Sequence, residues 1–200
     1  MMVETATEGI VKGPEFLEGR LVDLVPLDRH SYAMLNHRWT NDPLVCRFLY
    51  RGMFPTTVEN HFEAFDRTRA ASNEFELFIR RRTDNAVVGI TGLHTIFWPA
   101  RSAEFRILIG ERDAWGHGFG GEALGLLCRY AFQRLNLNRI WLGVNALNEQ
   151  AIASYRKAGF VVEGVLREDF FVEGRYCDTI RMSLLQREFN PAAFGFDPEA

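Results

Sequence analysis

A glycine-rich segment in the second half of the chain holds the residues whose types and spacing most clearly suggest binding chemistry. Residues 115–121 read WGHGFGG and lie between an expected strand and the start of the clearest helix. Successive glycines let backbone N–H groups point inward at close range, and the helix start adds a positive dipole. The segment therefore predicts a site for phosphate oxygens. A tight turn that binds nothing is the alternative, because strand-to-helix turns also use glycine for steric reasons alone.

Two phosphate-binding folds are excluded by context. The spacing of Gly116, Gly118 and Gly121 fits G-x-G-x-x-G. The dinucleotide-binding fold, however, places this fingerprint after its first strand and an acidic residue at the end of the next strand. Here the next strand ends at Val144 and Asn145, and too few residues follow for the further strand-helix units. A P-loop is excluded because G-x-x-x-x-G-K-[ST] does not occur in the sequence.

The histidines and cysteines predict no metal site. The five histidines share no ligand spacing such as H-E-x-x-H. The three cysteines are widely spaced and form no C-x-x-C pair, so neither a metal site nor a disulfide framework can be drawn. We expect all three to be reduced packing residues: Cys46, Cys128 and Cys177.

The composition fits one compact domain and excludes several classes of protein. The 200 residues are 47% hydrophobic and 24% charged, with a formal net charge of -3 and an isoelectric point of about 6.0. A nucleic-acid binder would need basic residues clustered on one face. No stretch offers the roughly 20 apolar residues that span a bilayer, and the N-terminus lacks the basic start and apolar core of a secretion signal. We expect a cytoplasmic protein with no nucleic-acid or membrane partner.

Hydrophobic periodicity and turn residues predict alternating strands and helices. Asp28 is expected to cap a first helix, Thr56 and Glu59 to form the capping box of a second, and Asn148 to cap a last helix that ends before Gly159. The longest apolar helical face follows the glycine-rich turn and comprises Leu124, Leu127, Cys128, Ala131, Phe132 and Leu135. The expected strands are residues 19–26, 75–82, 86–97, 103–109, 139–144, 160–172 and 175–185.

These elements predict an α/β class with a mixed sheet. Residues 19–189 are expected to form a single domain, because no Gly/Ser/Pro-rich linker divides them. Residues 1–18 are polar and aperiodic, and residues 190–200 carry two prolines. We expect the first of these ends to be a flexible segment and the second a loose tail draped on the body.

The glycine-rich turn and its surroundings resemble the GCN5-related N-acetyltransferases (GNAT). The acyl-CoA-binding turn of that family is written Q/R-x-x-G-x-G/A, and residues 115–120 match it except that Trp115 replaces Gln or Arg. The resemblance covers residues 86–187 closely and the N-terminal part by element order. The blocks at 103–109, 135–138, 148–160 and 163–182 look most like spermidine acetyltransferases and the ribosomal-protein N-terminal acetyltransferases.

The resemblance implies a fold and a cofactor. The fold is a mixed, mostly antiparallel twisted sheet of six to seven strands with about four helices, in which the strand before the turn splays from its neighbour. Acetyl-CoA would be the cosubstrate. Backbone groups at the end of the splayed strand would pair with its pantetheine arm, the turn amides would hold its pyrophosphate, and Asn148 would bind further along the arm. The implied cofactor-binding residues are Leu108, Ile109, Gly110, Trp115, Gly116, His117, Gly118, Phe119, Gly120, Gly121 and Asn148.

Acyl transfer from a thioester to an amine needs a neutral amine, donors for an oxyanion and a proton for the departing thiolate. Tyr155 matches the tyrosine that serves as general acid in many relatives; a core tyrosine beside Ala151 and Ile152 is the alternative. Glu104 is the acidic candidate for taking the proton of the amine, directly or through water. An ordinary ion pair with Arg106 is an equally weighted alternative for Glu104.

The acceptor amine is left open by the sequence. Residues 47–52 and 89–95 carry no acid, so a dication such as spermidine would lack charge partners there. Arg47 and Arg51 favour an anionic acceptor, for example an amino sugar nucleotide; a protein N-terminus or a small amine stays possible. Aromatic candidates for the acceptor cleft are Trp39, Phe48, Tyr50, Phe54 and Trp98. The alternative to an enzyme is a non-catalytic module that binds CoA. Transfer of acyl chains longer than acetyl also stays possible. The resemblance to the family further suggests a homo-oligomer.

Overall fold

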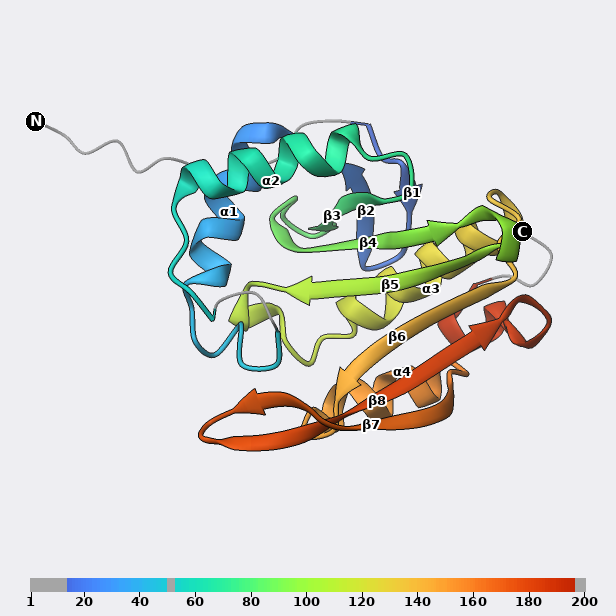
Figure 1. Cartoon of the computed structure of the whole chain (residues 1–200). Helices are drawn as coiled ribbons and strands as arrows, with labels where there is room; N and C mark the ends of the chain where they lie inside the picture. Colours follow the sequence, from blue (N-terminus) through green and yellow to red (C-terminus); the bar gives the residue numbers. More distant parts are fainter. Residues whose placement is uncertain (1–13, 50–52, 197–200) are drawn as a thin grey trace, which may run out of the picture.

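The computed structural model describes residues 14–49 and 53–196, which fold around one eight-stranded sheet (Figure 1). The strand order is β1-β2-β3-β4-β5-β6-β8-β7. All neighbours are antiparallel except β5 and β6, which are parallel. The strands are β1 Leu17–Glu18, β2 Val22–Pro26, β3 Phe75–Arg81, β4 Val87–Phe97, β5 Ser102–Ile109, β6 Arg139–Asn145, β7 Val161–Val172 and β8 Arg175–Leu185. The predicted mixed, mostly antiparallel sheet is confirmed, with the two-residue β1 as an additional strand.

Four α-helices cover the two faces of the sheet, as the resemblance implied. They are α1 Arg29–Thr40, α2 Val58–Ala70, α3 Phe119–Gln133 and α4 Glu149–Lys157. Side chains of α1 and α2 pack with Phe78 and Ile90 in one hydrophobic core. Side chains of α3 and α4 pack with β2, β5, β6 and β8 in the larger core on the other face. The helices thus bury the sheet from β2 to β6, whereas most of β7 is exposed.

The predicted helix caps hold with one exception. Asp28 and Asn148 accept from the backbone N–H groups of Ser31 and Ala151, and Gly159 takes the left-handed conformation after α4. The capping box of α2 was predicted one residue too early, at Thr56 and Glu59. It consists of Thr57 and Asn60, because the hydroxyl of Thr56 lies 3.0 Å from the ring of His61 instead.

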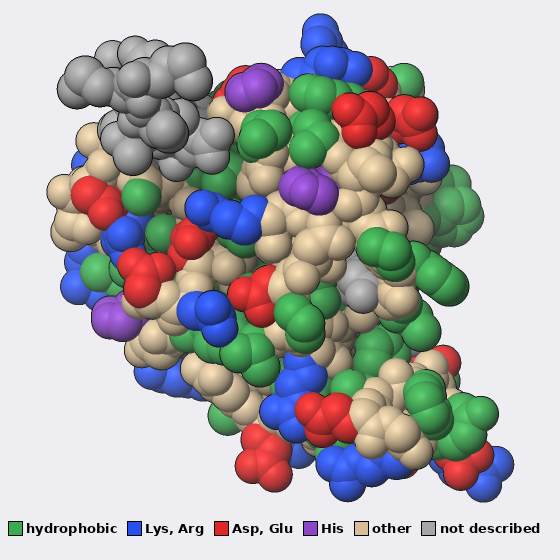
Figure 2. All heavy atoms as spheres, turned by 90° about the vertical axis from the view of Figure 1, so that its left-hand side faces the viewer, with side chains coloured by type: hydrophobic (Ala, Val, Ile, Leu, Met, Phe, Trp, Pro, Cys, Tyr) green, Lys and Arg blue, Asp and Glu red, His purple; other side chains and the backbone are tan. Residues whose placement is uncertain are grey.

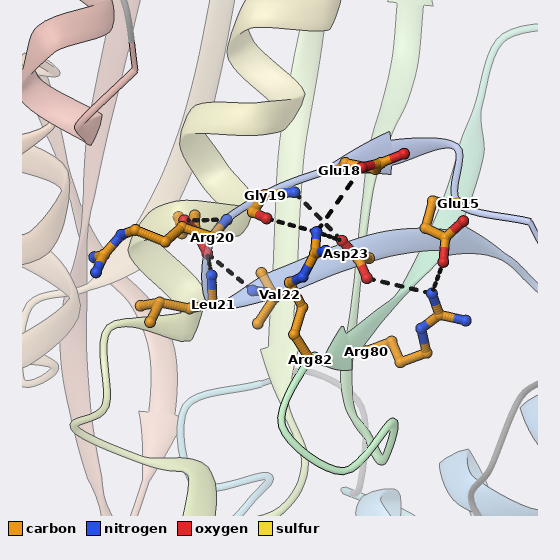
Figure 3. A network of polar contacts seen from close by, with 10 residues as sticks. Glu15, Glu18, Gly19, Arg20, Leu21, Val22, Asp23, Arg80 and Arg82 are labelled. Carbon is orange, nitrogen blue, oxygen red and sulfur yellow. Dashed lines mark hydrogen bonds and ion pairs between the residues drawn. The ribbon is translucent and has the colours of Figure 1, made fainter.

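Both ends of the described chain contact the folded body. Leu17 and Glu18 pair with β2, so the sheet begins before residue 19, and Glu15 forms an ion pair with Arg80 (Figure 3). After β8, a short 3-10 helix at Pro191–Phe194 follows. The ring of Phe194 lies where a Cβ on Gly125 of α3 would be, so α3 needs a glycine there.

All three cysteines are free and buried, as predicted. Burial raises the pKa of the Cys128 thiol, since the thiolate would lose its hydration. Within residues 14–49 and 53–196, no helix is both long and apolar enough to cross a membrane.

Strands β5 and β6 form a fork. They pair only from Ser102 to Glu104 on β5 and from Arg139 to Trp141 on β6, and then separate. Beyond that point β5 stays paired with β4, and β6 stays paired with β8. Figure 1 shows the two strands adjacent at one end and diverging toward the other. The predicted splay is confirmed, and it opens the sheet at its centre.

A buried carboxylate on α3 holds the N-terminal part of the sheet. Glu122 lies in the first turn of α3 and accepts from three consecutive backbone N–H groups, those of Arg20, Leu21 and Val22, at 2.9, 2.6 and 2.9 Å. Figure 3 shows this turn beside the ion pairs of Asp23 with Arg80 and Arg82. One side chain thus ties the turn before β2 to the start of α3.

We predict that Glu122→Ala lowers the free energy of unfolding by about 3 kcal/mol, because one buried and two partly buried N–H groups lose a charged acceptor. Chemical denaturation measures this change. The control is Glu149→Ala, which removes an exposed carboxylate from the first turn of α4 and should cost less than about 1 kcal/mol. Equal effects of the two substitutions would contradict the role of Glu122.

Candidate active site

The fork contains a cleft of about 520 Å³ between β5 and β6. Its walls come from β3, β4, β5, β6, α4, β7, β8 and the segment after α1, so residues far apart in the sequence meet there. Four of the predicted site residues line it: Glu104, Leu108, Asn148 and Tyr155. The glycine-rich turn lies outside the cleft lining, at the N-terminus of α3.

The turn presents a row of uncommitted backbone donors. Gly116 and Gly118 have φ angles of +79° and +84°, in the left-handed region that favours glycine. The first N–H of α3 that is bonded within the helix is that of Glu122, which donates to Gly118 O at 3.0 Å. Among the described residues, the N–H groups of residues 116–121 donate to no acceptor. Six free donors at a helix N-terminus suit an anion such as a diphosphate.

Some backbone groups at the end of β5 already form hydrogen bonds within the protein. The N–H of Gly110 donates to Val88 O at 2.9 Å, so this predicted donor to the pantetheine arm is used in the sheet. The indole N–H of Trp115 donates to Ile109 O at 2.9 Å. The Trp115 side chain therefore ties the start of the turn to the end of β5. From the sequence, Trp115 was noted only as a replacement of Gln or Arg, and this contact was not predicted.

His117 lies on the outside of the turn. Its Nδ1 is 2.9 Å from Trp115 O, and its ring stacks on that of Phe119 with centroids 5.8 Å apart. A carbonyl oxygen can only accept, so Nδ1 carries the proton and Nε2 is left facing away from this contact. Among residues 14–49 and 53–196, no group of three or more His, Cys, Asp or Glu side chains is arranged to hold a metal ion.

Tyr155 combines a core position with access to the cleft. Its ring contacts those of Phe105 and Phe160, with centroids 6.4 and 5.9 Å apart, and it packs against the larger core. Burial raises the pKa of Tyr155 to about 12, because the phenolate would lose its hydration. The side chain is therefore a protonated phenol across the physiological range. The core position that was one of the two interpretations is present, and the ring also lines the cleft, which the general-acid interpretation requires.

Glu104 stands at the point where the fork opens. It is the last residue of β5 paired with β6, opposite Trp141. Its carboxylate accepts from Arg106 at 2.7 Å. The ion pair that the sequence analysis weighed against a catalytic role is thus present, and both partners line the cleft.

Other parts of the cleft correct the expectation about charge partners. Residues 47–49 and 89–95 indeed supply no acid, but Glu76 of β3 and Asp169 of β7 line the cleft together with Glu104. The described lining therefore contains three carboxylates against two guanidinium groups, those of Arg106 and Arg181. Acidic side chains from β3 and β7 in this lining were not foreseen from the sequence.

The predicted arginines do not form an anion site in the described structure. Arg47 pairs with Glu173 at 2.8 Å, on the turn between β7 and β8, so its charge is balanced. Arg51 and Tyr50 lie outside the described residues. On the face of the molecule that Figure 2 shows, basic and acidic side chains are interspersed.

Most of the predicted cleft aromatics are elsewhere. Trp39 is buried in the smaller core, with its indole N–H on Glu111 at 2.8 Å. Phe54 is exposed, and Trp98 lines a different cavity. Only Phe48 of the described candidates lines the cleft. The other aromatic walls, which sequence analysis missed, are Phe105, Trp141 and Phe170.

Comparison with known proteins agrees with this geometry. Residues 21–161 match the family model described as an acetyltransferase (GNAT) domain. The chain is 33% identical over 168 residues to the spermidine N(1)-acetyltransferase of Escherichia coli K12, covering 84% of this chain and 88% of that protein. It is 33% identical over 106 residues to a putative ribosomal N-acetyltransferase of Bacillus subtilis, covering 53% of this chain and 57% of that protein.

A solved structure has the same fold. The spermidine N-acetyltransferase from Vibrio cholerae, crystallised in complex with CoA and spermine, superposes with a TM-score of 0.77 at 28% identity, covering 84% of this chain and 97% of that one. The family match, the splayed strands and the turn at the start of α3 lead to one conclusion. The chain belongs to the GNAT family and is an N-acetyltransferase that uses acetyl-CoA.

Proposed function

We propose that this enzyme acetylates a primary amine of a polyamine such as spermidine. The observation that carries the proposal is the set of three carboxylates in the cleft lining, Glu76, Glu104 and Asp169. Carboxylates in a partly enclosed cleft bind ammonium groups by charge-assisted hydrogen bonds. The relatives named as spermidine acetyltransferases support the same acceptor.

The cofactor-binding part of the proposal rests on the turn. Acetyl-CoA, when bound, supplies the thioester-activated acetyl group. The six uncommitted N–H groups of residues 116–121 would hold its diphosphate, and the positive end of the α3 dipole adds to the attraction. Leu108 and Asn148 line the cleft where the pantetheine arm would pass. Ile109 O already accepts the indole N–H of Trp115, so it has one acceptor position left for the arm.

Tyr155 would supply the proton for the leaving thiolate, and Glu104 would help to bind the acceptor ammonium. A thiol has a reference pKa of about 8.5, while the phenol of Tyr155 has a pKa of about 12. Tyr155 therefore holds its proton until a thiolate forms beside it in the same low-dielectric cleft, where the thiolate is also destabilised. On the acceptor side, Glu104 would contact the ammonium group at the mouth of the fork, with Arg106 fixing its carboxylate.

Self-association belongs to the same proposal. A solved Vibrio cholerae relative is described as dodecameric. In this chain β7 is the last strand of the sheet, and Val161, Val165 and Phe171 on it are each more than half exposed. Apolar side chains on a free sheet edge suit a contact with a second copy.

Gly118→Ala is expected to weaken acetyl-CoA binding at least tenfold. A φ of +84° strains any residue with a Cβ by about 1–2 kcal/mol, so the turn would shift and misalign its amides. Calorimetric titration with acetyl-CoA measures the effect. Gly164→Ala on β7, where a Cβ meets nothing within 4 Å, is the control. Unchanged affinity in Gly118→Ala would remove the turn from the binding site.

Tyr155→Phe should lower kcat by about 10²–10⁴, the usual contribution of a positioned acid, while the affinity for acetyl-CoA stays within about twofold. Thiol release measured with and without acceptor gives kcat corrected for hydrolysis. Tyr176→Phe, at an exposed tyrosine of β8, serves as the matched control. A wild-type protein that binds acetyl-CoA but transfers nothing would instead support the non-catalytic module.

The acceptor is identified by comparing kcat/KM for spermidine, an N-terminal ribosomal-protein peptide and an amino sugar nucleotide. We expect spermidine to be the best of the three, with an activity that falls as salt screens the carboxylates. A preference for the sugar nucleotide would restore the anionic acceptor, and a preference for the peptide would favour the ribosomal branch.

A further inference from the structure

A buried histidine joins two carboxylates next to the cleft. His94 lies on β4 and is 2% exposed. Its Nδ1 is within hydrogen-bond distance of Glu74 Oε2, at 2.9 Å. Its Nε2 is 3.4 Å from Glu76 Oε1, near enough for an ion pair but without a hydrogen bond in this structure. Both glutamates come from β3 or the residue before it. Groups of this polarity are costly to bury without partners, so their clustering needs a reason.

The two carboxylates open onto different cavities. Glu76 lines the cleft between β5 and β6 and also a second cavity of about 550 Å³, which Glu74 lines as well. The side chain of Glu74 is 26% exposed, whereas those of His94 and Glu76 are 2% and 4% exposed. The series Glu76, His94, Glu74 thus runs from the cleft, through the interior, to a solvent-facing group.

A glycine makes the first step of this series possible. Gly92 is the cross-strand partner of Glu76. A Cβ on Gly92 would lie 3.0 Å from both Cα and Cγ of Glu76, closer than side-chain carbons pack. The Cβ would also lie 2.3 Å from the backbone oxygen of Phe75, so both the backbone of β3 and the Glu76 side chain require a glycine at position 92.

The reaction itself releases a proton on this side of the cleft. A primary amine with a pKa near that of lysine, about 10.4, arrives as an ammonium ion at neutral pH. Only the neutral amine can attack the thioester, so the ammonium must lose one proton for each turnover. The leaving thiolate takes a proton from Tyr155, and Tyr155 must then regain a proton. The proton lost by the ammonium before attack has to reach water.

We propose that Glu76, His94 and Glu74 form a proton relay from the acceptor ammonium to the second cavity. An N–H bond of the ammonium breaks and an O–H bond forms on Glu76. That proton passes to Nε2 of His94 while the proton on Nδ1 passes to Glu74, which releases it to water. One proton enters and one leaves, and no other reactant is needed. The relay rests on the proposed function only in requiring a basic amine as acceptor.

Other charged groups surround the relay. On β5, Glu104 is the cross-strand partner of His94, and Arg106 is the partner of Gly92. On α2, Arg69 lines the second cavity with Glu74. These groups stay in place in the variants described next, so a change in pH dependence reports the relay residue that was replaced.

The test is the pH profile of kcat/KM for spermidine in His94→Gln and Glu74→Gln. Without the relay only the scarce neutral amine reacts, so we expect a loss of about 10²-fold at pH 7. The loss should shrink about tenfold per pH unit, until the variants approach the wild type near pH 9, since the neutral fraction of the amine rises about tenfold per unit. The KM for acetyl-CoA should not change.

Two exposed residues on the helices outside both cavities provide matched controls: His30→Gln and Glu63→Gln. Their profiles should overlay that of the wild type. A loss in His94→Gln that is equal at every pH would indicate a structural role and overturn the relay, as would an unchanged profile. A wild type that does not acetylate spermidine refutes the proposed acceptor; the profiles are then compared with the amine of the panel that it does acetylate.

Discussion

The separation of β5 from β6 after Glu104 and Trp141 is the constraint on which the rest of the site depends. A sheet normally pairs every interior strand on both sides, so a central strand that loses one neighbour leaves backbone groups without partners in the middle of the protein. Those groups and the side chains around them form a cleft whose walls come from both halves of the chain. The same opening exposes Tyr155, which would otherwise be an ordinary core tyrosine.

Helix α3 links this opening to the remainder of the fold. Its apolar face fills the larger core, its uncommitted N-terminal amides follow directly from the glycines before it, and Glu122 in its first turn holds three N–H groups of the turn before β2. A carboxylate this close to a diphosphate site would repel the ligand if it were free. The three N–H donors and the dipole of α3 compensate the charge of Glu122. The first turn of α3 can therefore anchor the N-terminal part of the sheet and still attract an anion.

The sequence predicted the parts of the structure that local chemistry determines. Strands, helix caps and the splay followed from periodicity, capping residues and the family resemblance, and the capping box of α2 slipped by one residue because the Thr56 hydroxyl bonds to His61. The charges that line the cleft were predicted incompletely for a physical reason. Glu76 lies on β3 and Asp169 on β7, with four strands between them in the sheet. Only the three-dimensional course of these strands brings both carboxylates to the cleft that Glu104 also lines. Arg47 carried no visible sign that Glu173 would balance its charge.

The function proposed for the site requires that the backbone N–H groups of residues 116–121 bind the diphosphate of CoA. Nuclear magnetic resonance of the protein labelled with ¹⁵N-glycine tests this binding most directly. Titration with CoA should move the amide signals of Gly116, Gly118, Gly120 and Gly121, whereas pantetheine, which lacks the diphosphate, should leave them in place. Signals that do not respond to CoA, or that respond equally to pantetheine, would contradict diphosphate binding at the start of α3.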